Sequence, residues 1–363
     1  MKLTKLYIHN YKSFYDTTIE LDKFNIIVGE NNSGKSNLID VLEFIDIFLR
    51  EGYIPAMTKK GGFDKILNYN NEEDTIFIEF CLDNKTFFKK NRITLKRELI
   101  HYSTIIYDSK KEIYQISSYR TNLAIDKHSD KYYLSNEKKH NSRDPHFMQL
   151  IPLSLILTSY AFNTEIIRNK SHRRAEKELN KDGSNLGQNL LHIKKNYLDS
   201  FNIISNSMIG VVNEIEGVDV QETFGNALLG FKERNQEIGI DMVSDGTINL
   251  LSTITALNQD EDKSILLAFD EPERYLHMTA VHYLMDAFRS TEKQILITTH
   301  STEVLKYADL NEVIFIYRDS DGDTQSIRAD KIPNLKEKME NMRYERPMRL
   351  DEIIDSGLLG SFE

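Results

Sequence analysis

The chain has 363 residues, of which 40% are hydrophobic and 28% are charged, which suits one large globular domain or two smaller ones. Its net charge of −10 excludes a surface that attracts nucleic acid everywhere, so any DNA contact must use a local basic patch. The single cysteine, Cys81, excludes an internal disulfide, and no apolar run approaches the roughly 18 residues of a membrane-spanning helix.

The first 50 residues predict a strand, a glycine-containing loop and a helix. Residues 2–28 indicate two or three strands, the last of them the apolar run 24–28. Residues 29–36 then fit G-x-x-x-x-G-K-[ST], and apolar residues follow at helical spacing to about Gly52. We expect Pro55 to prevent any continuation of the helix, and residues 59–62 to be a loop.

This setting is that of a phosphate-binding loop rather than a chance glycine turn. Gly29 and Gly34 allow the backbone to turn tightly, so that several N–H groups point at one anion. Lys35 would reach the β- and γ-phosphates, and the Ser36 hydroxyl would be one ligand of a hydrated Mg²⁺. We therefore predict a nucleotide site.

Residues 74–120 predict an antiparallel β lobe, with strands near 75–82, 92–98, 102–107 and 112–119. Cys81 falls in the first of these runs, so we expect a small buried residue rather than a nucleophile. The lobe is locally basic, through Lys85, Lys89, Lys90, Arg92, Lys96 and Arg97. A solvated sheet face is the favoured interpretation, and a contact to a phosphate backbone is the alternative.

The middle of the chain is less regular. We expect a polar loop over 121–146, a buried strand within 151–163 and a helical insertion over 164–210. Residues 168–174 form a second basic cluster at the start of that insertion, and 211–220 alternates weakly, as a strand would. Residues 241–318 return to strands at 265–269, 294–298 and 313–317 with a helix at 277–290, which implies a parallel sheet flanked by helices.

Two of these late strands end in side chains that could bind a metal or take part in catalysis. The first ends in Asp270 and Glu271, and the second in His300. Beside a phosphate loop, Asp270 would hold the metal, Glu271 would polarise an attacking water, and His300 would sense the γ-phosphate. An ordinary solvated turn and a structural histidine are the plainer alternatives.

The segment Ser244-Asp245-Gly246-Thr247 precedes an amphipathic helix and makes a second anion-binding helix start. One nucleotide does not need two such sites in one chain. We therefore expect Ser244 and Gly246 to face the γ-phosphate bound by another copy.

In order, these motifs resemble an ABC-type ATPase head of the RecF, SMC and OLD group, and most closely the OLD-like AAA ATPases. The resemblance covers nearly the whole chain, at Tyr11-Lys12-Ser13-Phe14, residues 29–37, Asp182-Gly183-Ser184-Asn185-Leu186, Ser244-Asp245-Gly246-Thr247, and Glu271-Pro272-Glu273 followed by Leu276-His277. It implies a single α/β head over 1–363, with a mostly parallel sheet flanked by helices, the antiparallel lobe, a short helical arm and no long coiled coil.

The resemblance also implies ATP and Mg²⁺ as cofactors, and a head-to-tail homodimer with residues 273–277 at its seam. Nucleotide contacts fall to Lys12, Gly29, Asn31, Asn32, Ser33, Gly34, Lys35, Ser36, Asn37, Ser244 and Gly246. Ser36 and Asp270 become the metal ligands, and Glu271, His300 and Lys35 the catalytic residues.

Three departures refine this interpretation. Ser-Asp-Gly-Thr replaces the Leu-Ser-Gly-Gly-Gln of transporters, which argues against a transport subunit, and no Q-loop glutamine can be assigned, Gln115 being a poor candidate. The 63 residues after His300 are too few for the Toprim domain of OLD-type nucleases. We therefore expect a cytoplasmic ATPase, with no membrane contact, that controls DNA or a separately encoded effector in DNA repair or anti-phage defence.

Two other functions compete with this one. An ATP-binding sensor or scaffold with negligible hydrolysis would use the same residues, whereas a nuclease would need a second carboxylate cluster that the sequence does not supply. Residues 319–323 resemble the opening of a calcium-binding EF-hand, but Thr324 occupies the position that requires glycine. We expect a hairpin turn there.

Overall fold

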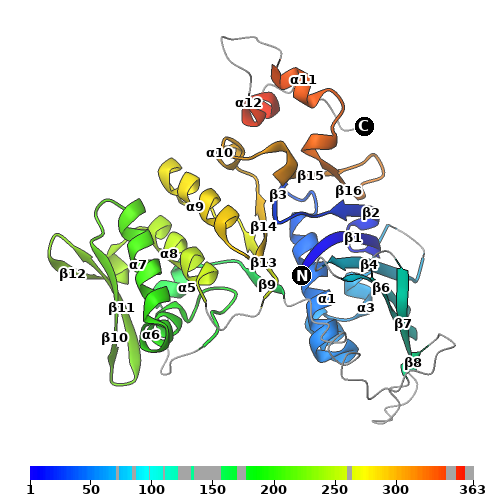
Figure 1. The fold of residues 1–363 in the computed structure, drawn as a ribbon, viewed down its shortest axis with the longest axis horizontal. Helices are drawn as coiled ribbons and strands as arrows, with labels where there is room; N and C mark the ends of the chain where they lie inside the picture. The colour runs from blue at the N-terminus through cyan, green and yellow to red at the C-terminus, as the bar shows by residue number, and fades with distance from the viewer. Residues whose placement is uncertain are drawn as a thin grey trace. The chain divides into compact units, whose positions relative to one another are not determined.

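The computed structural model describes residues 1–70, 73–83, 87–97, 99–108, 111–121, 132–134, 157–169, 177–259, 264–340 and 349–355 (Figure 1). The chain divides into two compact units. The phosphate-loop unit contains Met1–Leu157, Asn311–Pro333 and Gly360–Glu363, and the signature unit contains Thr158–Leu310 and Asn334–Leu359. The predicted loop over 121–146 lies almost wholly outside the described residues, as do 151–156.

The phosphate-loop unit contains the predicted antiparallel sheet. Its strand order is β2 (Phe14–Glu20), β1 (Lys2–Tyr11), β4 (Ile76–Asp83), β5 (Phe87–Leu95), β6 (Leu99–Asp108), β7 (Lys111–Thr121) and β8 (Tyr132–Leu134), each antiparallel to its neighbour. Alternate side chains of β1, such as Leu6 and Ile8, are fully buried. Cys81 on β4 is a free, buried thiol, which confirms the structural interpretation of this cysteine.

A second set of strands in this unit leads to the phosphate loop. β3 (Phe24–Val28) is buried along its whole length and pairs in parallel with β15 (Val313–Arg318), which pairs antiparallel with β16 (Thr324–Arg328). The turn between β15 and β16 is the hairpin expected at residues 319–323. α1 (Lys35–Glu51) follows the loop and buries one apolar face, through Leu38, Val41, Leu42 and Ile45.

The prediction that helix stops near Pro55 is wrong. α1 ends at Glu51 as expected, but α2 (Tyr53–Lys60) begins almost at once and α3 (Phe63–Ile66) follows. Pro55 is the third residue of α2, within the first turn, where backbone N–H groups have no partner inside the helix and a missing one costs little. The loop expected at 59–62 is therefore only the pair Gly61 and Gly62, both with positive φ.

The signature unit contains the other predicted parallel strands. β13 (Leu266–Asp270) pairs in parallel with β14 (Gln294–Thr299), and β9 (Leu157–Tyr160) lies next to β13. The helices around them are α5 (Thr164–Asn169), α8 (Asp245–Leu257), α9 (Met278–Ser290) and α10 (Thr302–Leu305). α11 (Leu335–Glu340) and α12 (Leu350–Asp355) also belong to this unit, whereas η3 (Ala329–Lys331) belongs to the phosphate-loop unit and η2 (Leu310–Glu312) begins at the last residue before that unit resumes.

The helical insertion is followed by strands that begin later than expected. α6 (Leu186–Asn196) and α7 (Leu198–Val211) pack on a three-stranded antiparallel sheet of β10 (Gly217–Thr223), β11 (Asn226–Glu233) and β12 (Gln236–Gly239). The strand predicted over 211–220 therefore starts only at Gly217. Its hairpin with β11 turns at Phe224-Gly225, and the next turns at Arg234-Asn235, all four residues with positive φ.

No described helix is long and apolar enough to cross a membrane. Among the helices that the structure describes, the longest is α1, with 17 residues, so none forms a long coiled-coil arm.

Candidate functional site

The phosphate loop, residues 29–34, joins the end of β3 to the start of α1. Gly34 precedes the helix with φ of 116° and Asn32 has φ of 68°, both in the left-handed region that lets successive N–H groups turn inward. A Cβ on Gly29 would overlap the carbonyl oxygen of Ile316 on β15. The loop geometry thus requires glycine at both positions that the motif specifies.

The polar side chains of the loop have distinct environments. Lys35 is buried, and its Nζ donates to the carbonyl oxygens of Gly29 at 2.6 Å and Glu30 at 2.8 Å. The Ser33 hydroxyl is buried without a hydrogen-bond partner in the protein. By contrast, other residues of the motif are exposed, among them Asn31, Asn32 and Ser36. An orphaned buried hydroxyl beside a held cation and a turn of N–H groups fits a phosphate chain.

Two residues that the resemblance assigned to nucleotide contacts are held by the protein itself. The Nζ of Lys12, at the turn between β1 and β2, lies 2.7 Å from Oδ2 of Asp40 on α1. Asn37 Nδ2 donates to the Ser13 hydroxyl at 2.7 Å. A nucleotide role for either side chain remains a prediction, because it requires exchanging these partners.

Asp40 on α1 contacts two lysine side chains, Lys12 and Lys60. Lys60 contacts it at 2.7 Å, and the Tyr11 hydroxyl donates to it at 2.7 Å. Burial acts to raise the pKa of Asp40, but the hydrogen bonds from Lys12 and Lys60 outweigh it and hold that pKa below the ordinary value. Asp40 is therefore an anion that fixes the β1–β2 turn to α1.

The signature unit brings the predicted acid and histidine together. β13 and β14 run in parallel, with Asp270 opposite Thr298, so their carboxyl ends meet at one edge. Glu271 follows with φ of 48°, and its N–H donates to the Thr298 carbonyl at 3.0 Å. The Nδ1 of His300 lies 2.8 Å from Oε1 of Glu271. A carboxylate only accepts hydrogen bonds, so Nδ1 carries the proton in this contact.

Asp270 is held at the same edge. The Thr298 hydroxyl donates to its Oδ1, which orients the carboxylate and leaves its second oxygen for another partner. Among the residues that the structure describes, no group of three or more His, Cys, Asp and Glu side chains could hold a metal by itself. A metal here would need oxygen ligands from a nucleotide or water, as Mg²⁺ sites on phosphates do.

The sequence placed Glu273 in the segment 273–277 expected at the dimer seam, but it did not predict that this carboxyl group would be buried. This side chain is only 8% exposed, accepts a hydrogen bond from the Thr299 hydroxyl, and has a second oxygen, Oε2, that is buried without a partner. Burial, and secondarily the charge of Glu271, raise the pKa of Glu273 to about 7. Its place three residues after Asp270 was visible in the sequence, but its burial was not.

The Ser244–Thr247 turn caps α8 as expected. The Ser244 hydroxyl accepts from the N–H of Thr247 at 3.1 Å, which is the usual N-cap arrangement. Gly246 lies so close to the Tyr275 carbonyl that a Cβ would overlap it. Asn249, one turn further on, donates from Nδ2 to the carbonyls of Pro272 at 3.0 Å and Arg274 at 2.9 Å. The turn is thus fixed to the segment that follows Glu271.

Arg168 holds the chain just before this turn. Its guanidinium donates to the carbonyls of Ile240 at 2.7 Å and Val243 at 2.6 Å, and to Oδ1 of Asp245 at 2.9 Å. Arg168 belongs to the basic cluster considered for DNA, and these bonds give it a structural task. Residues 170–174 of that cluster lie outside the described residues.

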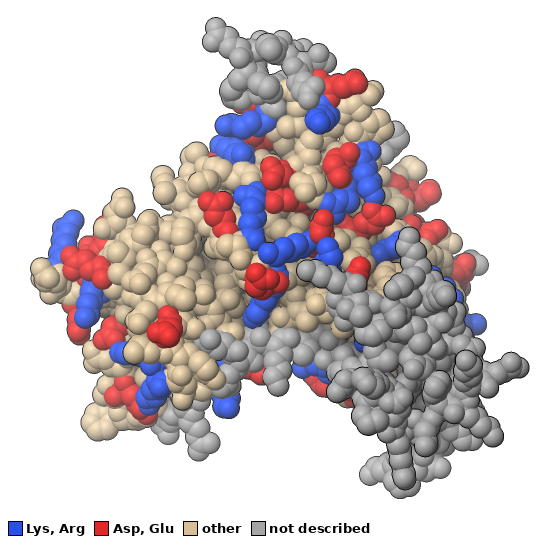
Figure 2. Space-filling model, in the orientation of Figure 1, with Lys and Arg blue, Asp and Glu red and all other residues tan. Residues whose placement is uncertain are grey.

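Three basic side chains of the β lobe have acidic partners inside the unit. Lys90 and Arg92 both contact Glu79 at 2.8 Å, and Arg97 contacts Asp64 at 2.8 Å. Lys89 is buried, which lowers its pKa. On the face shown in Figure 2, acidic and basic side chains are intermixed over the described part of the surface. The ion pairs of Lys90, Arg92 and Arg97 favour the solvated sheet face over a phosphate-backbone contact. Lys85 and the side chain of Gln115 are not described.

Comparison with known proteins identifies the class. A family model described as "AAA domain, putative AbiEii toxin, Type IV TA system" matches residues 24–306. The chain belongs to this AAA-domain family. The matched range includes the phosphate loop, the Ser244–Thr247 turn, Asp270, Glu271 and His300.

Three curated relatives resemble the chain over most of its length. It is 25% identical to the Old nuclease of Escherichia phage P2, covering 89% of this chain and 60% of that protein. It is 22% identical to the Endonuclease GajA of Bacillus cereus, with 87% and 58% covered, and 22% identical to an ATP/GTP phosphatase of Helicobacter pylori, with 83% and 86% covered. The chain therefore spans less than two thirds of the length of the first two.

Solved structures give the same fold. A SMC head bound to the C-terminal winged-helix domain of ScpA aligns with a TM-score of 0.57 at 17% identity, over 91% of this chain and 99% of that one. A Pyrococcus furiosus Smc head bound to the C-terminal domain of ScpA aligns at 0.53 and 15% identity, over 93% and 99%. This AAA-domain protein thus has the α/β fold of an SMC head. The family model and the Old nuclease and GajA relatives support the resemblance to ABC-type ATPases of the OLD and SMC group that the motifs indicated.

Proposed function

We propose that this protein binds and hydrolyses ATP in a Mg²⁺-dependent reaction, and that ATP binding joins two copies head to tail. The contact that supports hydrolysis most directly is the one between Glu271 and His300, at the joint end of β13 and β14. A carboxylate and a histidine so placed can orient a water molecule and accept its proton. Membership of an AAA-domain family supports the nucleotide as the substrate.

The phosphate loop would bind the nucleotide. The N–H groups at Gly34 and Lys35 open α1, so the helix dipole and the turn both favour an anion. Lys35 would transfer its hydrogen bonds from the carbonyls of Gly29 and Glu30 to phosphate oxygens. Ser36, which is exposed at the first turn, and Asp270 would hold Mg²⁺, whose charge would stabilise the negative charge that develops on the phosphates.

Glu271 would act as the general base. His300 donates from Nδ1 to Oε1 of Glu271, which leaves the other carboxylate oxygen to accept the proton of an attacking water. The side chain of His300 is 55% exposed and that of Glu271 is 28% exposed, so both are accessible to a substrate. His300 would thereby position the base and respond to the γ-phosphate through its second nitrogen.

The second copy would contribute Ser244 and Gly246. Their turn presents the start of α8, a 13-residue helix capped by Ser244 itself. Met242, two residues before Ser244, is 74% exposed. Tyr275, whose carbonyl lies beside Gly246, is 57% exposed, and Met278, three residues after it, is 46% exposed. Apolar exposure of this kind favours a partner surface. Opening and closing of the dimer would then act on DNA or on a separately encoded effector protein, in repair or anti-phage defence.

The relatives support the effector part only in outline. Two of them are named as nucleases, but this chain spans 60% and 58% of their lengths, so their activity is not carried over to it. The third is named an ATP/GTP phosphatase and is covered over 86% of its length, which fits a nucleotide-hydrolysing unit.

Catalysis is tested by the change Glu271→Gln. The amide cannot accept a proton, so we expect phosphate release to fall at least about 100-fold while ATP still binds. Wild-type and variant protein would be compared in a phosphate-release assay with Mg²⁺, with Glu237→Gln on β12 as an exposed control. Equal rates for wild type and Glu271→Gln would reject the assignment of the base.

Dimerisation needs a separate measurement. Sedimentation of Glu271→Gln with and without Mg·ATP would show a monomer-to-dimer shift, and Ser244→Ala would weaken that shift. A Glu271→Gln protein that binds ATP yet stays monomeric at all concentrations would reject the sandwich.

The alternative function is an ATP-binding sensor with negligible hydrolysis. The observation that favours it is the Ser-Asp-Gly-Thr turn, which lacks the glycine pair and glutamine of the transporter signature. This alternative predicts wild-type phosphate release no faster than that of Glu271→Gln, together with ATP-dependent dimerisation in both proteins.

A further inference from the structure

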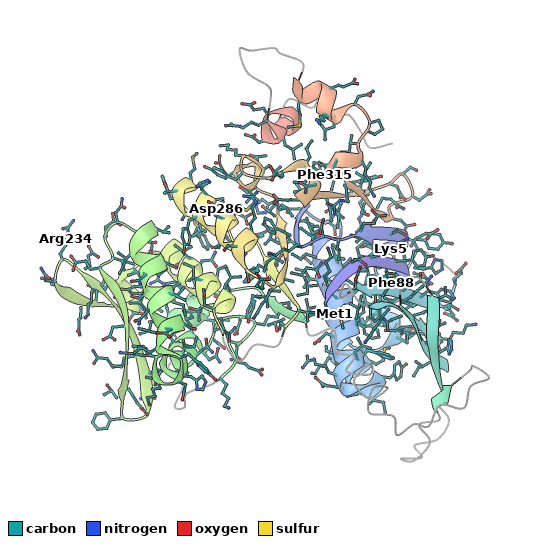
Figure 3. The ribbon with its side chains drawn as sticks, in the orientation of Figure 1. Met1, Lys5, Phe88, Arg234, Asp286 and Phe315 are labelled. Atoms are coloured by element: carbon teal, nitrogen blue, oxygen red, sulfur yellow. The ribbon has the colours of Figure 1, made fainter. Side chains whose placement is uncertain are left out.

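The hairpin of β15 and β16 lies against the phosphate loop and contacts it through Ile316, Arg318 and Thr324. It comprises residues 313–328, which follow the range 24–306 matched by the family model. β15 pairs with β3 up to Phe315 opposite Val28, and the next residues of β15 continue beside the loop (Figure 3, where Phe315 is labelled). All of these residues belong to the phosphate-loop unit.

Thr324, the first residue of β16, is the centre of the contact. It is fully buried, and its hydroxyl lies 2.9 Å from the carbonyl oxygen of Ser33 and 2.8 Å from the hydroxyl of Ser13. Its N–H donates to the Ser13 carbonyl at 2.7 Å, and its carbonyl accepts from the Thr17 hydroxyl. A Cβ on Gly34 would lie 2.5 Å from the Thr324 hydroxyl, so this side chain sets the space that the loop glycine occupies.

The protons of these groups can be counted. The Ser33 carbonyl can only accept, so the single proton of the Thr324 hydroxyl goes to it. The Ser13 hydroxyl then donates its own proton to Thr324, and it accepts from Asn37 Nδ2 at 2.7 Å. Each of the two hydroxyl groups thus donates one hydrogen bond and accepts one. The result is a closed chain of hydrogen bonds from α1, through the β1–β2 turn and β16, to the loop.

Arg318 holds the opposite, exposed side of the loop. At the end of β15, its Nε donates to the carbonyl of Asn32 at 3.0 Å and its Nη1 to the carbonyl of Gly322 at 2.7 Å. Asn32 is the loop residue with φ of 68°, a conformation that a non-glycine residue keeps only when neighbours hold it. Carbonyls that are fixed outward leave the neighbouring N–H groups pointed inward.

We propose that Thr324 and Arg318 are positioning residues that hold the phosphate loop in its anion-binding shape before a nucleotide arrives. This proposal rests on the proposed ATP site and adds residues to it. Neither side chain needs to touch the nucleotide. Preorganisation of the loop lowers the cost of ordering it on binding, so loss of the hydroxyl should weaken ATP binding.

The test compares Thr324→Val, Thr324→Ser and Ser326→Ala. Valine keeps the shape of threonine but leaves the Ser33 carbonyl without this donor and the proton of the Ser13 hydroxyl without this acceptor. Serine restores the hydroxyl. Ser326 is the matched control, because it lies two residues along β16 and donates to the Thr18 carbonyl at 2.9 Å, away from the loop. Arg318→Ala tests the exposed side.

Two readouts are needed. In nucleotide-free protein, amide hydrogen exchange of residues 29–36 should become about tenfold faster in Thr324→Val and stay at the wild-type rate in Thr324→Ser and Ser326→Ala. The dissociation constant of Mg·ATP, measured by calorimetric titration, should rise about tenfold in Thr324→Val and stay at the wild-type value in Thr324→Ser and Ser326→Ala. Arg318→Ala should shift both readouts in the same direction.

A folded Thr324→Val protein with unchanged exchange in the loop would overturn the inference. If Thr324→Val does not fold, Arg318→Ala decides in its place, and wild-type exchange in that variant is the contradicting result. Wild-type protein that binds no ATP would overturn the proposed function instead, and the exchange measurement would still decide whether the hairpin holds the loop.

Discussion

The carboxyl group of Glu273 is buried with one oxygen unpaired, and burial raises its pKa to about 7. Below pH 4.5 the group is protonated in both the folded and the unfolded state. Between pH 4.5 and about 7 the unfolded chain releases the proton while the folded protein keeps it, so the free energy of unfolding falls as the pH rises. Above about pH 7 the decrease in the free energy of unfolding is complete, and the pKa shift of Glu273 corresponds to a decrease of roughly 3 kcal/mol.

The change Glu273→Gln should remove this pH dependence, because glutamine keeps the shape of the neutral acid without a titrating proton. We expect the variant to be as stable as wild type near pH 4 and more stable by up to roughly 3 kcal/mol near pH 8. Urea unfolding at both pH values measures the difference, with Glu237→Gln as the exposed control. A wild-type protein whose stability does not fall over this range would contradict the assignment.

Glu273 also illustrates what one sequence cannot show at the scale of a residue. Asp270, Glu271 and His300 were predictable, because parallel strands deliver the residues after them to one edge of a sheet. Thr324 was considered only as the residue that spoils a calcium loop, whereas its hydroxyl meets Ser13, 311 positions away in the chain. Hydrogen bonds of that separation leave no periodicity or spacing to read.

At the scale of elements, residues 24–51 were predictable because every local signal agreed: a buried apolar run, two glycines and an amphipathic helix. The boundary between α7 and β10 was not, because Val211 belongs equally well to an apolar helix face or a weak strand. α2 was missed because a proline was taken to end a helix, although Pro55 sits in the first turn, where it is tolerated.

The segment before α8 gives a prediction at the same scale. Arg168 satisfies the carbonyls of Ile240 and Val243 and pairs with Asp245, whose pKa it lowers, mainly through its hydrogen bond. Arg168→Ala leaves these acceptors unpaired, so we expect a loss of about 1–3 kcal/mol in stability and faster proteolysis at 240–244. Arg234→Ala, in the exposed β11–β12 turn labelled in Figure 3, is the matched control.

A DNA contact through Arg168 would give a different outcome. The variant would then keep wild-type stability and lose affinity for a DNA duplex, with a shallower dependence of binding on salt. Measuring both unfolding and duplex binding therefore separates the structural task from the one first considered for this cluster.

At the scale of the molecule, Mg·ATP is proposed to bind the folded protein, in which the phosphate loop has its anion-binding shape. A ligand that binds only the folded state stabilises it by an amount that depends on its concentration relative to the dissociation constant, about 2.7 kcal/mol at 100 times that constant. The nucleotide should therefore raise the melting temperature of the protein by a few degrees.

Lys35→Ala should abolish this shift, because it removes the charge that the phosphate loop holds for the nucleotide. Lys59→Ala is the control, since Lys59 lies in the same unit and makes only an exposed ion pair with Glu51. Thermal melts would be recorded for both variants in the Glu271→Gln background, so that ATP is not consumed, with and without Mg·ATP. A nucleotide-dependent shift that survives Lys35→Ala would place ATP elsewhere on the protein and remove the basis for the proposed reaction.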